Sequence, residues 1–151
     1  MKEISHRSAC PISFTLDFFG DKWTLLILRD MIIKNKTTFA EFQQSDEGIA
    51  SNILTNRLKM LEGYGFVFKY PVQGKSRTAY FLTPKGITIV PIIIEMALWG
   101  AAQGYDSEEK ELAKSLKKNK ESTLKSLSRN LTKKYKLIVE KHAIMGSAVS
   151  E

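Results

Sequence analysis

Apolar residues recur at helical spacing through the first part of the chain. Ile12, Leu16 and Phe19 are four and three positions apart, so we expect them to line one face of a short helix. The next segment, 22–33, is so rich in leucine, isoleucine and methionine that it must lie near the centre of the core. The pattern predicts helices over residues 11–19, 22–33, 39–44 and 51–64.

Residues that favour helix ends stand at the boundaries of these segments. Pro11 suits a first helical position, and Glu41 is placed to support the cap of the third helix. Gly65 is expected to end the fourth helix. The expected N-caps are Cys10, Asp21, Thr37 or Thr38, and Ser51.

The hydrophobic period changes from 3.6 to 2 after residue 65. Phe66, Phe68 and Tyr70 alternate with Val67 and Lys69. The segment 77–82 alternates again, and a turn is expected between the two at 73–76. The pattern predicts a β-hairpin whose tip is basic, because it carries Lys75 and Arg77.

A further helix is predicted after the hairpin. Thr83 and Pro84 form a cap and a first helical position, and the apolar run continues to Gly100 with an expected kink at Pro91. Its isoleucine-rich face is expected to pack against a partner subunit rather than a membrane, together with the first helix.

The composition changes at Gly104, beyond which lysine, glutamate and serine dominate. Leucines at spacings of three and four over 107–142 predict one or two amphipathic helices, broken near Asn119–Ser122. The last segment has no pattern and is expected to be disordered. The expected organisation is a domain at 8–104, a helical extension at 105–142 and a tail at 143–151.

Three short helices followed by a hairpin predict a mainly α fold with a small β-hairpin wing, the winged helix-turn-helix. In this fold the helix before the wing, here 51–64, enters the major groove of DNA. Its apolar residues Ile53, Leu54, Leu58 and Leu61 would face inward. Its outward stripe would be Asn52, Thr55, Asn56 and Lys59, with Arg57 beside it to reach phosphate. Ser51, at the helix start, is a further candidate DNA contact.

The outward stripe carries the chemistry of base recognition. Asparagine pairs with adenine, threonine contacts the thymine methyl group, and lysine reaches guanine or phosphate. The stripe has no carboxylate. An ordinary solvated helix face has a similar composition, so the stripe indicates DNA binding only in combination with the basic hairpin next to it.

Charge and composition narrow the classes of function. The formal net charge of +7 favours polyanionic partners, although residues 1–104 contribute only +3 and residues 105–151 contribute +4. The single cysteine suits a reducing cytoplasm. No transmembrane segment is expected, because the apolar window 87–98 is broken by Pro91 and Glu95, and the polar N-terminus does not resemble a signal peptide.

A set of short motifs in order resembles the HxlR-type regulators, a branch of the winged-helix MarR-like superfamily. The resemblance covers about residues 8–104. Its motifs are Cys10-Pro11, the run 20–28, 39–42, 48–51, Leu54-Thr55, Arg57-Leu58, Leu61-Glu62, Gly65, 80–86, Pro91 and Trp99-Gly100.

The resemblance implies a homodimeric DNA-binding regulator, expected to be a repressor, on a roughly palindromic double-stranded operator. The DNA contacts expected beside the recognition helix are Thr37 and Thr38 at a helix start and Lys75, Ser76 and Arg77 in the wing. Ala50 stands where the family more often has serine, and Ala79 where an acidic residue often precedes the tyrosine.

Cys10 is a candidate sensor of a small-molecule oxidant or electrophile. A thiol at a helix N-terminus is stabilised as thiolate, and His6 and Arg7 are near in sequence. Several members of the family that the chain resembles sense oxidants through a cysteine at this place. The alternative is a buried structural cysteine, because free cysteine is among the most buried residue types.

Other chemistry has little support in the sequence. Trp23 and Trp99 are expected to pack in the core or an interface rather than line a ligand pocket. The tail lysines are expected to form the solvated face of a dimerising or covering helix. The alternative is that these lysines add non-specific affinity for DNA. No catalytic constellation, metal site or cofactor is expected. The alternative function is a winged-helix protein-interaction module without DNA binding, and a cysteine-dependent enzyme is a distant third.

Overall fold

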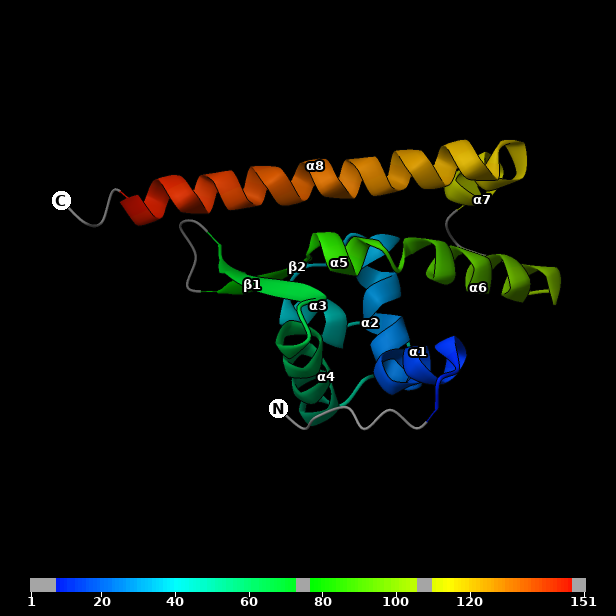
Figure 1. Cartoon of the computed structure of the whole chain (residues 1–151), viewed down its shortest axis with the longest axis horizontal. Coiled ribbons are helices and arrows are strands. Elements are labelled where there is room, and N and C mark those ends of the chain that lie inside the picture. Colours follow the sequence, from blue (N-terminus) through cyan, green and yellow to red (C-terminus); the bar gives the residue numbers. More distant parts are fainter. Residues whose placement is uncertain (1–7, 73–76, 106–109, 148–151) are drawn as a thin grey trace.

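The computed structural model describes residues 8–72, 77–105 and 110–147. The long helix α8 lies across α5 and α6, and α4 lies on the opposite side of the molecule (Figure 1). The elements in order are α1 Pro11–Phe19, α2 Lys22–Ile32, α3 Phe39–Gln43, α4 Ser51–Gly63, β1 Val67–Pro71, β2 Thr78–Leu82, α5 Pro84–Ile87, α6 Val90–Ala102, α7 Lys110–Lys118 and α8 Lys120–Ser147.

Helix α2 forms the centre of the core, as its apolar composition predicts. It contacts α1, α4 and α6. Burial of its aliphatic side chains against α4 removes apolar surface from water, which is the main favourable term in folding. The buried residues of these two helices include Ile27, Leu28, Met31, Ile32, Leu54, Leu58 and Leu61.

Helix α1 forms where the sequence predicts it, but its buried face is a different one. Ile12 and Leu16 are exposed, at 72% and 52% of their surface. Phe19 of the predicted stripe is buried, and Phe18 is buried beside it, because both rings pack edge-on against Phe66, with centroids 5.5 and 4.9 Å apart. The predicted stripe therefore leaves two large apolar residues on the surface.

Local capping signals account for most helix starts. The Asp21 carboxylate accepts a hydrogen bond from the Thr24 backbone N–H at 3.0 Å, as expected. The expected cap at Ser51 is wrong. Ala50 is the N-cap, because its carbonyl already accepts the first helical hydrogen bond from Leu54 N–H, which makes Ser51 the first helical residue. Gly65 follows α4 with φ +73°, a conformation that favours glycine.

The hairpin is antiparallel, as the alternation predicts. Val67 lies opposite Leu82 and Pro71 opposite Thr78. The middle of β2 is tied to the residues just before α3, because Tyr80 N–H donates to the Thr37 carbonyl at 2.7 Å. Mainly helical structure with this one hairpin is the winged helix-turn-helix fold that the sequence predicts.

The helix predicted over 84–100 is interrupted rather than kinked. It divides into α5 and α6 at residues 88–89, just before Pro91. Proline lacks the N–H group, and its ring crowds the carbonyl four residues earlier, that of Ile87. The stretch Pro84–Ala102 is long and apolar enough to cross a membrane by composition, but core helices pass the same test, and Ile93 and Ile94 are buried in the core here.

The C-terminal extension packs onto the domain as two helices. The break falls at Asn119, inside the expected region, and the Asn119 side chain accepts a hydrogen bond from Ser122 N–H at 2.9 Å. Leu131 of α8 is 2% exposed, and the Tyr135 ring packs edge-on against Phe68 of the wing at 5.4 Å. Helix α8 continues to Ser147, five residues beyond the expected boundary at 142.

Gly86 occupies a position where no larger residue fits. A Cβ atom there would lie 1.9 Å from the Phe66 carbonyl oxygen, so the backbone would have to move. We expect Gly86→Ala to lower the free energy of unfolding by about 3 kcal/mol, measured by denaturant unfolding.

Gly100→Ala is the matched control, because nothing lies within 4 Å of a Cβ at this helical position. Alanine favours helix over glycine, so this variant should be unchanged or more stable by roughly 0.5–1 kcal/mol. Equal stability of the two variants would contradict the close approach of Gly86 to Phe66.

Candidate nucleic-acid interface

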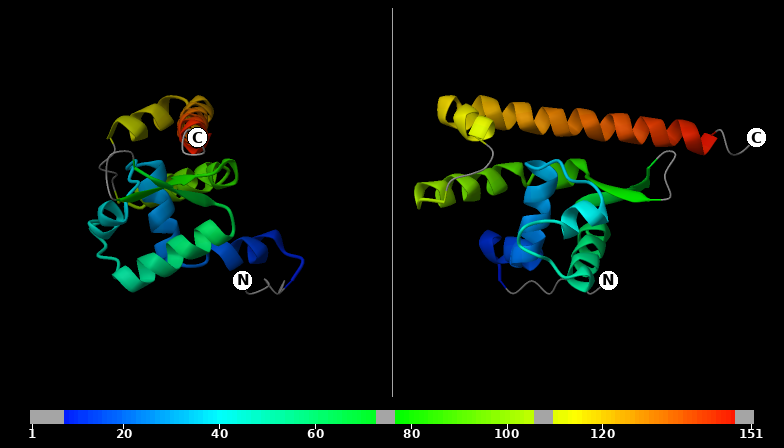
Figure 2. Two further views of the ribbon diagram at one scale, coloured as in Figure 1. Left: turned by 90° about the vertical axis from the view of Figure 1, so that its left-hand side faces the viewer. Right: turned by 180° about the vertical axis from the view of Figure 1, so that it is seen from behind.

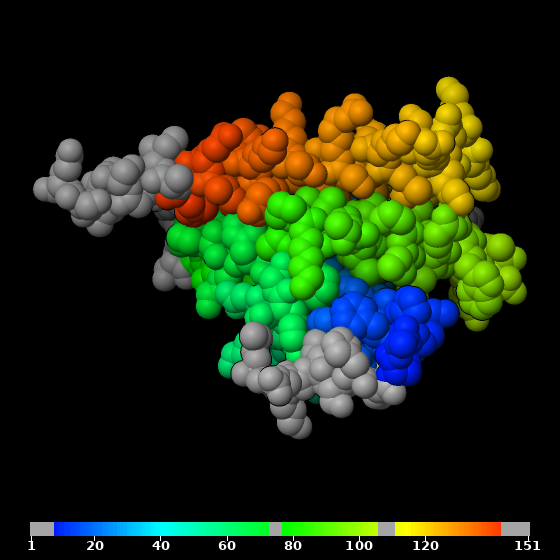
Figure 3. Space-filling view, in the orientation of Figure 1, coloured from blue at the N-terminus to red at the C-terminus, as the bar shows by residue number. Residues whose placement is uncertain are grey.

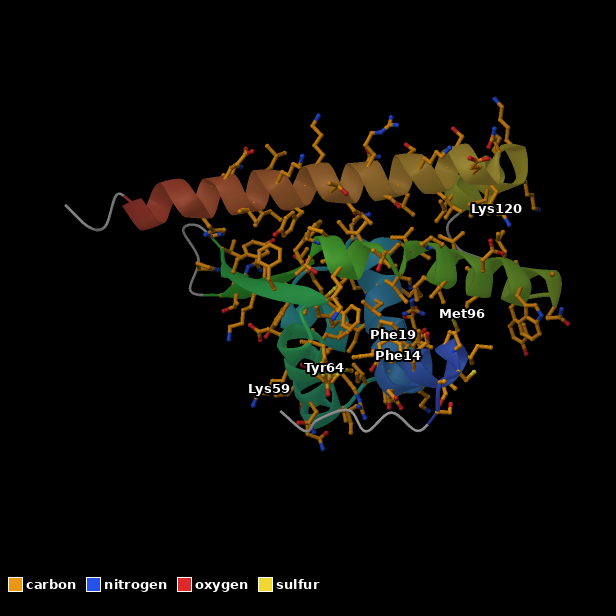
Figure 4. The ribbon with its side chains drawn as sticks, viewed as in Figure 1. Phe14, Phe19, Lys59, Tyr64, Met96 and Lys120 are labelled. Atoms are coloured by element: carbon orange, nitrogen blue, oxygen red, sulfur yellow. The ribbon has the colours of Figure 1, made fainter. Side chains whose placement is uncertain are left out.

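The outward face of α4 is polar and open to solvent. Ser51, Asn52, Asn56 and Lys59 are exposed, and Lys59 projects away from the core (Figure 4). Thr55 is half-buried, and its hydroxyl donates to the Ser51 carbonyl at 2.8 Å. The structure thus brings the predicted stripe together on one face, at the N-terminal end and middle of α4.

Arg57 is held within the domain rather than left free beside the stripe. Its guanidinium forms an ion pair with Asp21 at 3.1 Å, between Nη2 and Oδ2, and its Nε atom is buried without a hydrogen-bond partner in the described part of the chain. Asp21 thus caps α2 and binds α4 at the same time. A phosphate contact by Arg57 would have to compete with the carboxylate of Asp21, and it stays a prediction.

The threonines before α3 serve that helix. Thr38 is buried, and its hydroxyl oxygen accepts from Glu41 N–H at 3.3 Å in a capping box. Burial opposes ionisation of Glu41, but the backbone N–H groups of Thr37 and Thr38 donate to its carboxylate at 2.8 Å and lower its pKa overall. Thr38 is thus buried in its own capping box, whereas Thr37 stays half-exposed, and contact of either residue with DNA stays a prediction.

The wing lies beside α4 on the same side of the molecule, as the view in the left panel of Figure 2 shows. Arg77 is exposed next to its tip, where the Arg77 carbonyl accepts from Val72 N–H at 3.0 Å. The other two predicted wing contacts, Lys75 and Ser76, fall outside the described residues.

Lys85 fixes the other end of α4. Its ammonium donates to the Tyr64 carbonyl at 2.8 Å, at the C-terminus of the helix, and lies 4.4 Å from the centroid of the Phe66 ring. A cation at this end also complements the helix dipole. The sequence analysis missed this contact, because the two partners are 21 residues apart.

A network of charges holds the segment that leads into α4. The Arg29 guanidinium binds both Glu47 and the buried carboxylate of Asp30, and Lys36 reaches Asp30 at 3.2 Å. Ser45, in the turn between α3 and α4, donates to Asp30 as well. The hydrogen bond from Arg29 holds the pKa of Glu47 at about 2, well below its ordinary value of 4.5.

Cys10 is exposed at the N-cap of α1, so the alternative of a buried structural cysteine is wrong. Its neighbours His6 and Arg7 fall outside the described residues.

Trp99 is on the surface, 70% exposed, whereas Trp23 is half-buried against the core. Neither tryptophan lines the cavity of about 470 Å³ between α2 and α6, which is bordered by Leu25, Arg29, Ile93, Met96 and Tyr105, among others.

The trihelical core, the polar face of α4 and the adjoining hairpin define a helix-turn-helix transcriptional regulator. A model of the HxlR-like helix-turn-helix family matches residues 18–110, and the chain belongs to that family. The match ends at the start of α7, so α7 and α8 lie almost wholly outside it.

Known proteins agree with this assignment. The HTH-type transcriptional regulator YybR of Bacillus subtilis is 35% identical over 96 residues, which cover 63% of this chain and 76% of that protein. The redox regulator HypR in its reduced form shares 34% identity at a TM-score of 0.55, over 62% of this chain and 92% of that one. The reduced transcriptional regulator YodB from B. subtilis shares 25% identity at a TM-score of 0.51, over 62% and 92%.

The pKa of Glu47 makes the charge network testable by acid. A carboxyl whose pKa is lowered in the folded state adds stability above its unfolded pKa and loses that contribution as pH falls through the folded value. We expect part of the stability to be lost between pH 4.5 and about 2, and Glu47→Gln to reduce that loss. Denaturant unfolding across this range measures it, and an unchanged pH dependence in the variant would contradict the Arg29–Glu47 pairing.

Proposed function

We propose that this protein is a sequence-specific transcriptional repressor that binds double-stranded operator DNA as a homodimer through α4. The observation that carries the proposal is the exposed stripe of Asn52, Asn56 and Lys59, free of carboxylates and next to the wing. Amide groups can pair with base edges in the major groove, and Lys59 can reach guanine or phosphate. A cytoplasmic location accompanies this role.

The homodimer is supported by apolar residues that this single chain leaves in water. On α6 they are Ile92, Met96 and Trp99, spaced four and three positions apart, and 43%, 49% and 70% exposed. On α1 they are Ile12 and Leu16. Exposed apolar patches of this kind mark protein interfaces, and Figure 4 places Met96 on the side of α6 that faces α1.

Regulation through Cys10 is the finer part of the proposal. The thiol is exposed at the start of α1, beside the apolar face proposed for dimerisation. A structural neighbour with 34% identity is a redox regulator. Oxidation or alkylation of Cys10 would then alter the dimer and so the spacing of the two α4 helices. With a single cysteine in the chain, oxidation joins two subunits or adds a small thiol.

DNA recognition by α4 is tested with Asn56→Ala in a mobility-shift assay on the DNA upstream of the protein's own gene. Loss of one bidentate base contact should weaken specific binding by roughly 5- to 150-fold and leave binding to random DNA nearly unchanged. Asn130→Ala, an exposed asparagine on α8, is the matched control. Wild-type affinity of Asn56→Ala would overturn the assignment of the recognition face, and the absence of any specific shift would favour the protein-interaction module.

The dimer is tested with Trp99→Asp, whose charge cannot be buried in an apolar interface without a large cost. We expect the wild-type chain to sediment as a dimer and the variant as a monomer. Leu137→Asp on α8, also at an exposed apolar residue, should remain dimeric. A wild-type monomer, or a dimer unaffected by Trp99→Asp, would contradict the interface.

The sensor role is tested with Cys10→Ser in the same mobility-shift assay, with and without diamide or a quinone. Wild-type binding should change on treatment, whereas the variant should not respond because it has no thiol. If both proteins respond alike, Cys10 is not the sensor.

A further inference from the structure

The positive charge of this protein is concentrated on its two C-terminal helices. Residues 110–147 contain eleven Lys and Arg against three Asp and Glu, a net charge of +8. The rest of the chain is left with a net charge of −1. Residues 1–104 carry a net charge of only +3, so most of the excess charge belongs to helices that lie almost wholly outside the family match.

The two faces of α8 differ in kind. Its inner face packs on the domain through Leu124, Leu127, Leu131, Tyr135 and Ile138. Its outer face carries Arg129, Lys133 and Lys136, which we call the basic ridge. They are spaced i, i+4 and i+7 and all are exposed.

The basic ridge has few counter-charges nearby. No Asp or Glu occurs between residues 122 and 139, although Glu140 lies one turn beyond Lys136 along the same face. No ridge residue has a carboxylate partner in the part of the chain that the structure describes. Lys125, one turn before the ridge, is paired with Glu121 at 2.6 Å. Like charges at i, i+4 on a helix repel each other, and a bound polyanion would offset this repulsion. A helix that only covers the core has no use for such a row of cations.

The ridge and α4 lie on opposite sides of the domain. Helix α8 rests on α5, α6 and β2 by its inner face, and α4 lies below these elements (Figures 1 and 2). The side chains of α8 stand out along the outer edge of the molecule in Figure 3. A duplex held against α4 would therefore leave the ridge open.

We propose that the basic ridge binds the phosphate backbone of a second duplex DNA segment, without sequence preference. Its three cations span about 10 Å at 1.5 Å per residue, and duplex DNA presents one negative charge per ~1.7 Å of axis. Bridging of two segments rests on the proposed function of α4, whereas binding by the ridge alone does not. An anionic membrane fits less well, because interfacial helices bury an apolar face in lipid and the leucine face of α8 is already buried in protein.

The first test measures the affinity of the full-length protein for a random-sequence duplex at several salt concentrations. The variant R129Q/K133Q/K136Q should bind about tenfold or more weakly, with a salt slope lower by about three, roughly one for each lost phosphate contact. These residues are exposed, so the variant should unfold at the wild-type denaturant concentration.

Two variants serve as controls for this measurement. K114Q/K117Q/K118Q removes the same charge from exposed positions on α7 and should bind almost as well as wild type. R129K/K133R/K136R keeps the charge of the ridge and should retain binding. An equal loss in the α7 variant would show that net charge alone matters and would overturn the ridge.

The second test asks for bridging. The upstream duplex is immobilised, the protein is added, and retention of a labelled random duplex is measured. Wild type should retain it, whereas the ridge variant should bind the immobilised duplex normally and retain none. Equal loss of both activities would place the ridge on the same duplex as α4 and overturn the proposal of a second segment.

Failure of the proposed function gives a different result. Asn56→Ala should lose the preference for the upstream duplex and keep the ridge-dependent binding of random DNA in the first test. The membrane alternative is tested by sedimentation of the protein with vesicles that contain phosphatidylserine. Ridge-dependent binding to vesicles without ridge-dependent binding to DNA would overturn the proposal in favour of a membrane surface.

Discussion

The position of α4 depends on one buried carboxylate, Asp30, at the end of α2. A charge with 2% exposure is tolerated only where partners replace water, and here the partners are Arg29, Lys36 and Ser45. They come from α2, from the turn after it and from the turn before α4. Arg29 also binds Glu47, so the same network reaches the residues that lead into α4.

The middle and the C-terminal end of α4 are fixed by contacts that are distant in sequence. Arg57 in its middle turn is bound to the cap of α2 through Asp21, and Lys85 holds the carbonyl of Tyr64 at its end. Gly86 permits the close approach of α5 to Phe66. The proposed recognition face is thus supported by ion pairs and hydrogen bonds from other elements, as a precise binding site requires.

Helix α8 covers one side of the domain and adds a basic surface to it. Its inner face completes the core at Leu131 and supports the wing through Tyr135, so it is part of the folded domain. Its outer face carries the basic ridge, in a segment whose net charge of +8 exceeds the +3 of residues 1–104. One amphipathic sequence thus supports the proposed recognition surface from behind and presents a separate surface of its own.

The sequence by itself determined the order of elements, most caps and the outward stripe of α4, because these depend on local periodicity and on hydrogen bonds within a few residues. Asp21 and Asn119 show this. Tertiary structure decided the buried face of α1, the capture of Arg57 and the burial of Thr38, because a competing partner or a packed ring came from a distant part of the chain. The local pattern predicts which contacts a residue is able to make, and only tertiary packing decides which of these contacts it makes.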